Sequence, residues 1–237
     1  MHERGGSEFL DTVEVGPGHG EPADAAVVWL HGLGADGHDF EPIVPELRIP
    51  PSIRVRFVFP HAPVIPVTLN FGMEMRAWFD LKGPSLDRIE HDEAGVRRSA
   101  VAIERIIRRE IERGVPASRI VLCGFSQGGA MALHVGLRFP DALAGIAALS
   151  SFLLLPDQLA AEASDANRRT PVLICHGTLD PMVPERMGRA SFERLRDLGW
   201  NAEYHRWPME HQVCTEEIRL LGRWFEDRLA RRPAGGA

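Results

Sequence analysis

No apolar stretch in this sequence approaches the roughly 20 residues that a membrane helix needs, and the nearest candidate is the short run Phe152–Leu155. The opening residues Met1–Leu10 contain no apolar core between a basic start and a cleavage site of small residues, so no secretory signal is expected. We therefore predict a protein without stable membrane insertion that resides in the cytoplasm.

Positive charge is also in short supply. The chain carries 27 Lys and Arg against 33 Asp and Glu, for a formal net charge of −6, which argues against a nucleic acid as partner. Arginines concentrate only between Arg97 and Arg113, where they alternate with Val, Ile and Glu at helical spacing. This pattern is typical of the solvated face of an amphipathic helix.

Cysteine is scarce, and the patterns that hold metals are missing. Cys123, Cys175 and Cys214 cannot all pair, and two of them fall in predicted buried strands, so we expect reduced core residues. The chain has ten histidines but neither a His-Glu-x-x-His nor a Cys-x-x-Cys spacing. No metal and no cofactor are expected.

Apolar strand-like runs alternate with helical patterns along the chain. The runs lie near residues 27–31, 54–59, 119–124, 145–150, 171–176 and 202–207, and the helical patterns near 39–47, 92–113, 127–138, 185–198 and 215–230. Such alternation predicts an α/β fold with a mostly parallel sheet and helices on both faces. A further strand near 9–15 would form an antiparallel edge. We expect one domain over residues 1–237, with a frayed tail at 231–237.

A possible nucleophile lies in Gly124–Gly128, which reads Gly-Phe-Ser-Gln-Gly and follows the apolar run Arg119–Cys123. A strand, a sharp turn and a helix in this order place a serine, here Ser126, at the turn. Gly124 and Gly128 would keep side chains from colliding where the strand packs on the helix. Cys123 is an alternative nucleophile, but it lies one turn before the apex of the bend, which Ser126 occupies.

Two further polar residues follow predicted strands. Asp180 lies in the loop after the run Pro171–Gly177, and His211 ends the loop Pro208–His211 after the run Ala202–Trp207. Serine needs a base to take its proton and a carboxylate to orient that base, and serine, acid, histidine is a known chain order for such triads. A turn-forming aspartate and a structural histidine are the alternatives for each residue taken singly.

A glycine-rich loop, His31–Gly37, follows the buried run Ala25–Leu30. Such a loop can point backbone N–H groups at the oxygen that becomes negative during acyl transfer. The expected donors are the amides of Leu33 and of Gln127, the residue after the serine. A phosphate site is the alternative, but the loop fits neither the Gly-x-Gly-x-x-Gly nor the P-loop pattern.

Five segments together resemble the phospholipase/carboxylesterase family of α/β-hydrolases, which includes the acyl-protein thioesterases. They are His31–Gly37, Met75–Asp80, Gly124–Gly129, His176–Pro184 and Pro208–His211. The resemblance covers nearly the whole chain. It implies an α/β-hydrolase fold with no large cap domain, acting on small-molecule carboxylic esters or thioesters through an acyl-enzyme intermediate. Small relatives often pair, so a homodimer is possible.

The same resemblance implies roles for individual residues. Ser126 would be the nucleophile, Asp180 the acid and His211 the base, with Leu33 and Gln127 supplying the oxyanion hole. The acyl chain would lie near Leu33, and two further residues, Phe152 and Met182, would contact it.

The long segment from residue 60 to about 90 carries Phe71, Trp78 and further apolar residues, too many for a disordered loop. We interpret it as a wall of the acyl pocket, with Phe71 and Trp78 against substrate; mere coverage of a sheet edge is the alternative. A salt bridge between Arg76 and Asp80 would pin it. His31 and His176, each before a glycine, are expected to brace their loops by hydrogen bonding.

The prediction is a serine hydrolase cleaving carboxylic esters with short to medium acyl chains. Acyl-protein thioesterase or lysophospholipase activity is the alternative within the family. A catalytically silent hydrolase fold that acts as a binding protein, or an enzyme for amides, is the alternative outside it.

Overall fold

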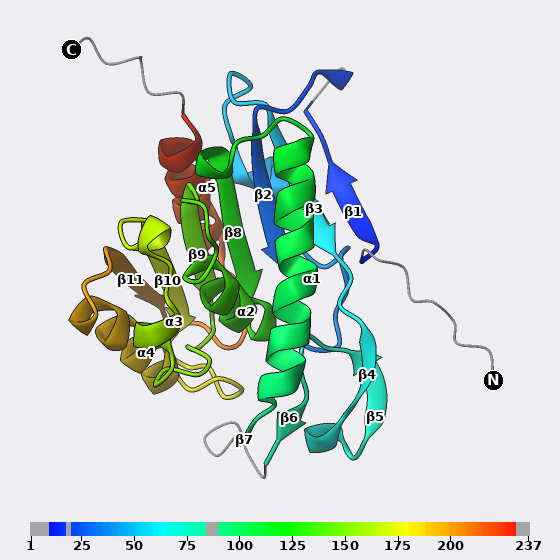
Figure 1. Cartoon of the computed structure of the whole chain (residues 1–237), viewed down its shortest axis with the longest axis vertical. Helices are drawn as coiled ribbons and strands as arrows, with labels where there is room; N and C mark the ends of the chain where they lie inside the picture. The colour runs from blue at the N-terminus through cyan, green and yellow to red at the C-terminus, as the bar shows by residue number, and fades with distance from the viewer. Residues whose placement is uncertain (1–9, 18–19, 84–89, 231–237) are drawn as a thin grey trace, which may run out of the picture.

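The computed structural model describes residues 10–17, 20–83 and 90–230. Its centre is a seven-stranded sheet in the order β1-β3-β2-β8-β9-β10-β11 (Figure 1). The strands are β1 Thr12–Val15, β2 Ala25–Leu30, β3 Val55–Pro60, β8 Ile120–Phe125, β9 Gly145–Leu149, β10 Val172–Gly177 and β11 Ala202–Trp207. Only β1 pairs antiparallel, with β3, so the predicted antiparallel edge and the mostly parallel sheet are both confirmed.

Helices cover both faces of this sheet. They are α1 Glu93–Glu112, α2 Gln127–Gly136, α3 Leu159–Glu162, α4 Glu185–Asp197 and α5 Thr215–Leu229. In Figure 1, α1 and α2 cross in front of the strands and α5 lies behind them. No large cap domain stands over the sheet in the described part of the chain, and the predicted fold class is confirmed.

The alternation of side chains along each strand creates two separate cores. Ala26 and Val28 of β2 pack in one cluster with residues of α1, α2 and α4. Ala25 and Val27 point the other way and pack in a second cluster with residues of α5. Because successive side chains of a strand point to opposite faces, strands this apolar must be covered on both sides.

The arginine-rich segment is the outer face of α1, as predicted. The side chains that α1 buries, including Val96, Ile103 and Ile107, recur at helical spacing. Arg97 lies on the exposed face and pairs with Glu93 and Glu162 at 2.8 and 2.7 Å. Arg97 is therefore engaged in ion pairs on the surface of α1.

Two elements differ from the prediction. The helical pattern at 39–47 is a 3-10 helix, η2, over Glu41–Leu47, because Pro42 and Pro45 lack the N–H groups of an α-helix. The segment from 60 to 90 is no irregular loop. It forms hairpins of β4 Val64–Val67 with β5 Met73–Arg76, and of β6 Leu81–Lys82 with β7 Glu90–His91, and the first hairpin includes the 3-10 helix η3 Thr68–Asn70.

The remaining expectations concern bulk properties. Cys123 and Cys175 are buried free thiols, and Cys214 is a partly exposed one. Across the described ranges, no helix combines the length and apolarity needed to cross a membrane. The predicted frayed tail at 231–237 lies outside the described residues, and the single-domain organisation over 1–237 stays a prediction.

Candidate active site

Ser126 occupies a strained turn between β8 and α2. Its backbone has φ 54° and ψ −119°, an uncommon conformation for a residue with a side chain. The Ser126 N–H donates to the Leu149 carbonyl at 2.8 Å, and the Ser151 hydroxyl donates to the Ser126 carbonyl at 2.7 Å. The neighbouring strand β9 and the loop after it therefore hold the turn in place.

Glycines on either side of Ser126 make this turn possible. A Cβ added to Gly124 would lie 2.3 Å from the Gly128 carbonyl oxygen, and one added to Gly128 would lie 2.3 Å from the Leu30 carbonyl oxygen. Both distances are far below any van der Waals contact between carbon and oxygen. The predicted steric role of the two glycines is confirmed.

Ser126, His211 and Asp180 lie in one hydrogen-bonded chain. The His211 Nε2 atom is 2.9 Å from the Ser126 Oγ atom, and the His211 Nδ1 atom is 2.7 Å from the Asp180 Oδ2 atom. Asp180 is buried, and His211 and Ser126 are partly buried. This is the geometry in which an imidazole can take a hydroxyl proton while a carboxylate fixes its tautomer.

The environment of Asp180 favours its charged form. Burial alone would raise the pKa of Asp180, but hydrogen bonds from His211 and from the backbone N–H groups of Val183 and Met182 lower it overall. The two N–H groups donate to the Asp180 Oδ1 atom at 2.8 and 2.9 Å. The other carboxylate oxygen is left for His211. Sequence reasoning missed these two amides, because only the folded turn after Pro181 brings them within hydrogen-bonding distance of the Asp180 carboxylate.

Backbone contacts between two loops bring Asp180 and His211 together. The Thr178 and Leu179 N–H groups donate to the Trp207 and Met209 carbonyls at 2.8 and 3.1 Å. A Cβ on Gly177 would lie 2.3 Å from the Met209 carbonyl oxygen, so the close approach requires glycine there. His176 braces the acid loop as predicted, because its Nε2 atom donates to the Val183 carbonyl at 2.8 Å.

His31 braces the glycine-rich loop in a similar way. Its Nδ1–H donates to the Gly32 carbonyl at 2.7 Å, and its Nε2 atom accepts from the Ala62 N–H at 3.0 Å. Burial lowers the pKa of His31 to about 4, so the ring is neutral near pH 7 and can accept that bond. The predicted bracing role of His31 is confirmed.

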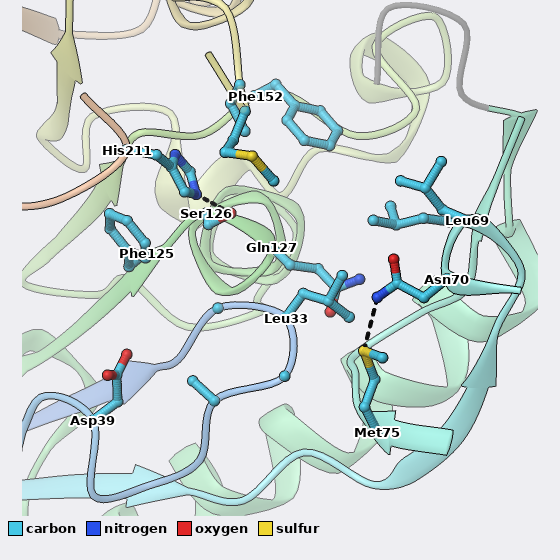
Figure 2. A pocket seen from close by; sticks show the side chains of 16 residues that line it. Leu33, Asp39, Leu69, Asn70, Met75, Phe125, Ser126, Gln127, Phe152 and His211 are labelled. Carbon is cyan, nitrogen blue, oxygen red and sulfur yellow. Dashed lines mark hydrogen bonds between the residues drawn. The ribbon is translucent and has the colours of Figure 1, made fainter. Parts of the chain in front are cut away.

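Gln127 follows Ser126 and begins α2, whose first N–H groups have no partner within the helix. Its buried side chain is occupied elsewhere, accepting from the Trp78 N–H and donating to the Phe79 carbonyl, both at 2.8 Å. The backbone N–H of Gln127 is thus the group of this residue available to an oxyanion. Leu33 lies beside it in the loop (Figure 2).

A cavity of about 490 Å³ opens beside Ser126. Leu33, Phe152 and Met182 line it, as the resemblance implied, and Figure 2 shows Leu33 and Phe152 on two sides of Ser126. Most of the lining is apolar, which suits an acyl chain.

Phe71 and Trp78 do not line this cavity. Phe71 is 102% exposed in the turn between β4 and β5, where its φ of 57° directs the chain back on itself. Trp78 is buried, and its Nε1–H donates to the His31 carbonyl at 2.9 Å, so it supports the glycine-rich loop from behind. Both side chains are apolar enough for a pocket, but neither lines this cavity.

The segment from 60 to 90 contributes other residues to the cavity, namely Leu69, Asn70, Met75 and Leu81. The predicted salt bridge between Arg76 and Asp80 is wrong. Asp80 instead accepts from the Thr68 N–H and hydroxyl, both at 2.7 Å, and Arg76 donates to the Ala62 carbonyl at 2.8 Å. Sequence reasoning also missed Asp39 and Phe125 in the lining, although Phe125 lies within the Gly124–Gly128 motif and Asp39 lies two residues after the loop His31–Gly37.

The structure gives less support to the two alternative chemistries, a cysteine nucleophile and a metal centre. Cys123 is fully buried on the α5 side of the sheet, and burial raises the pKa of its thiol well above the usual value. No group of three or more His, Cys, Asp or Glu residues poised to hold a metal occurs in the ranges the structure describes.

Comparisons with known proteins show which proteins the chain is similar to. A family model described as phospholipase/carboxylesterase matches residues 13–226. Acyl-protein thioesterase 1 of Neurospora crassa is 40% identical over 214 residues, which cover 86% of this chain and 87% of the relative. The crystal structure of Arabidopsis thaliana SOBER1 superposes with a TM-score of 0.81 at 33% identity, over 86% of this chain and 99% of that one. The crystal structure of Zea mays acyl-protein thioesterase 2 gives 0.80 at 28% identity, over 94% and 100% of the two chains.

Proposed function

The chain belongs to the phospholipase/carboxylesterase family, and we propose that it is a serine hydrolase that cleaves carboxylic esters with short to medium acyl chains through an acyl-enzyme intermediate. The observation that carries the proposal is the hydrogen-bonded chain from Asp180 through His211 to Ser126 at the edge of an apolar cavity.

The proposed reaction has two halves. Ser126 Oγ attacks the acyl carbon while His211 Nε2 accepts the hydroxyl proton, and His211 then gives that proton to the departing alcohol or thiol. Water repeats the attack on the acyl-enzyme, which releases the carboxylic acid and restores Ser126. Asp180 holds the His211 Nδ1–H throughout, and the Leu33 and Gln127 amides receive the developing oxyanion.

Replacing Ser126 by alanine tests the nucleophile directly. We expect Ser126→Ala to lower kcat on a chromogenic short-chain ester by roughly a thousandfold or more, because no other hydroxyl replaces the attacking atom. The thermal midpoint should stay close to that of the parent, which circular dichroism checks. Survival of more than a small fraction of activity would exclude Ser126 as the nucleophile.

A silent hydrolase fold that only binds ligands is separated from an enzyme by covalent labelling. A fluorophosphonate reacts with an activated serine, so we expect stoichiometric labelling of the parent and none of Ser126→Ala. Failure of the folded parent to be labelled would support a binding protein.

Thioester hydrolysis on acylated proteins is the second candidate, favoured by curated relatives named acyl-protein thioesterase 1 at 37 to 42% identity. The cavity near Leu33, Phe152 and Met182 would take the acyl chain in either case. Rates measured side by side on oxygen esters and thioesters, from acetyl to palmitoyl, decide between the candidates, with lysophospholipid included as a third substrate class.

We further propose a cytoplasmic location, a homodimer and a single domain. The free thiols of Cys123, Cys175 and Cys214 suit a reducing compartment. The homodimer follows from the family resemblance, and light scattering at several protein concentrations tests it. A single cooperative unfolding transition would support one domain.

A further inference from the structure

The catalytic cavity carries one carboxylate that the proposed reaction does not use. Of the 16 residues that line the cavity, Asp39 and His211 are the ionisable ones, and Asp39 is the sole acid. The rest of the lining is apolar or neutral. A single charge on such a surface biases which substrates can bind beside it.

Asp39 has no partner of opposite charge in the part of the chain that the structure describes. No hydrogen bond or ion pair reaches its side chain, while the neighbouring Asp36 accepts from the His38 N–H at 2.8 Å and His38 pairs with Glu41 at 2.8 Å. Burial, and then the charge of Asp36, raise the pKa of Asp39. The side chain of Asp39 is nevertheless exposed to solvent, so within the described residues it is free to meet a cationic ligand in the cavity.

The position of Asp39 identifies the part of the substrate it would meet. Phe40, its chain neighbour, lies 5.5 Å from the Phe125 ring centre, and Phe125 lies 4.8 Å from the His211 ring centre. Figure 2 shows Asp39 and Phe125 on the His211 side of Ser126, with Leu69 and Met75 on the opposite side.

The leaving group must lie on the His211 side, because His211 has to donate a proton to the departing atom. The acyl chain then extends toward the apolar side. Phe125 and Asp39 line the same cavity as His211, so a leaving group long enough to extend past His211 would meet them. An aromatic face and a carboxylate together form a site for an organic cation.

We propose that Asp39, with the ring of Phe125, selects esters and thioesters whose leaving alcohol or thiol carries a positive charge, such as a quaternary ammonium or a basic peptide. This inference rests on the proposed function and adds a substrate class to it. Asp39 acts on binding of the leaving group and takes no part in the proton transfers.

The test compares two substrates of nearly the same shape. Butyrylcholine carries a cationic leaving group, and 3,3-dimethylbutyl butyrate is its neutral isostere. We expect the parent to favour the cation in kcat/KM, and Asp39→Asn to reduce the cation-to-neutral ratio by about twofold to fivefold, the range for the loss of an exposed charge pair. Asp227→Asn removes the same charge from α5, far from the cavity, and should leave the ratio unchanged.

Two further measurements keep the outcome decisive. Asp39→Glu retains the charge and should retain most of the preference for the cationic ester. This variant therefore distinguishes the loss of a charge from a change in the structure of the loop. For the parent, raising the salt concentration from about 0.05 M to about 0.5 M should weaken the preference, because salt screens partly exposed charges.

Failure of the proposed hydrolase function and failure of the role proposed for Asp39 give different results. If neither ester is hydrolysed and the fluorophosphonate does not label Ser126, the proposed function fails. If both esters are hydrolysed and Asp39→Asn shows the same ratio as the parent and as Asp227→Asn, the inference is overturned while the hydrolase remains.

Discussion

Ser126 can adopt its strained backbone only because the residues around it leave no room for relaxation. The turn is held by the Leu149 carbonyl on one side and the Ser151 hydroxyl on the other. Gly124 and Gly128 let the strand and helix approach closely enough to fix it. Strain at one residue is thus balanced by packing contributed by its neighbours.

Replacing Gly128 by alanine should disturb this arrangement. The new methyl group would lie 2.3 Å from the Leu30 carbonyl oxygen, so α2 or β2 must shift. We expect Gly128→Ala to lower the free energy of unfolding by about 1 to 3 kcal/mol, the usual cost of overpacking, and to lower ester hydrolysis with it. Urea denaturation measures the first effect.

Gly16→Ala is the matched control for that change. A Cβ at Gly16 has nothing within 4 Å, so the same substitution there should leave stability and rate nearly unchanged. Equal stability of Gly128→Ala and Gly16→Ala would show that the close approach at Gly128 is not required.

At the scale of elements, the hairpin of β4 and β5 forms one side of the cavity through Leu69 and Met75. Its position depends on hydrogen bonds that cross to the next hairpin, from the Thr68 N–H and hydroxyl to Asp80. A charge-assisted pair of bonds of this kind is a strong local anchor. The anchor holds the start of the connection between β4 and β5, three residues before the exposed Phe71.

Removing this anchor should affect long substrates more than short ones. We expect Asp80→Ala to lower kcat/KM for a decanoyl ester by roughly threefold to tenfold relative to a butyryl ester, because only the longer chain contacts the hairpin side of the pocket. Glu74→Ala, an exposed acid on β5, is the control. An unchanged chain-length profile in Asp80→Ala would argue that the acyl chain lies elsewhere.

At the scale of the whole molecule, one buried carboxyl links pH to stability. Glu217 is fully buried in the first turn of α5, beside the Cys214 backbone and the Cys175 thiol. Burial raises the pKa of Glu217 from 4.5 to about 8. The folded protein therefore keeps a proton there that the unfolded chain has lost at neutral pH.

The sign of the effect follows from this difference in bound protons. Between pH 4.5 and about 8, the folded state holds more protons at Glu217, so stability decreases as pH rises. The slope from this group is at most about 1.4 kcal/mol per pH unit. We expect Glu217→Gln to flatten the pH dependence of the unfolding free energy in this window.

Denaturant unfolding at several pH values measures this slope. Glu216→Gln, a neighbouring acid on the exposed face of α5, should keep the parent's slope. Parallel pH profiles for Glu217→Gln and the parent would contradict a proton held at Glu217.

The succession of strands and helices along the chain could be predicted from the sequence because it depends on local pattern. Continuous apolar runs such as Ala25–Leu30 must be buried on both faces, and the helical patterns between them leave few other folds. The turn at Ser126 was predictable for a similar reason, since its glycines are adjacent in the chain. The 3-10 helix at Glu41–Leu47 was missed although its prolines were visible.

The sequence by itself determined which residues could perform acyl transfer, because hydroxyl, imidazole and carboxylate follow strand ends in a recognisable order. Only the tertiary structure decided that the Ser126 and His211 atoms, 85 residues apart, lie 2.9 Å from each other. The same holds for Phe71 and Trp78, of which one is 102% and the other 1% exposed. Both are aromatic, and the difference comes from partners distant in the chain, which local pattern does not specify.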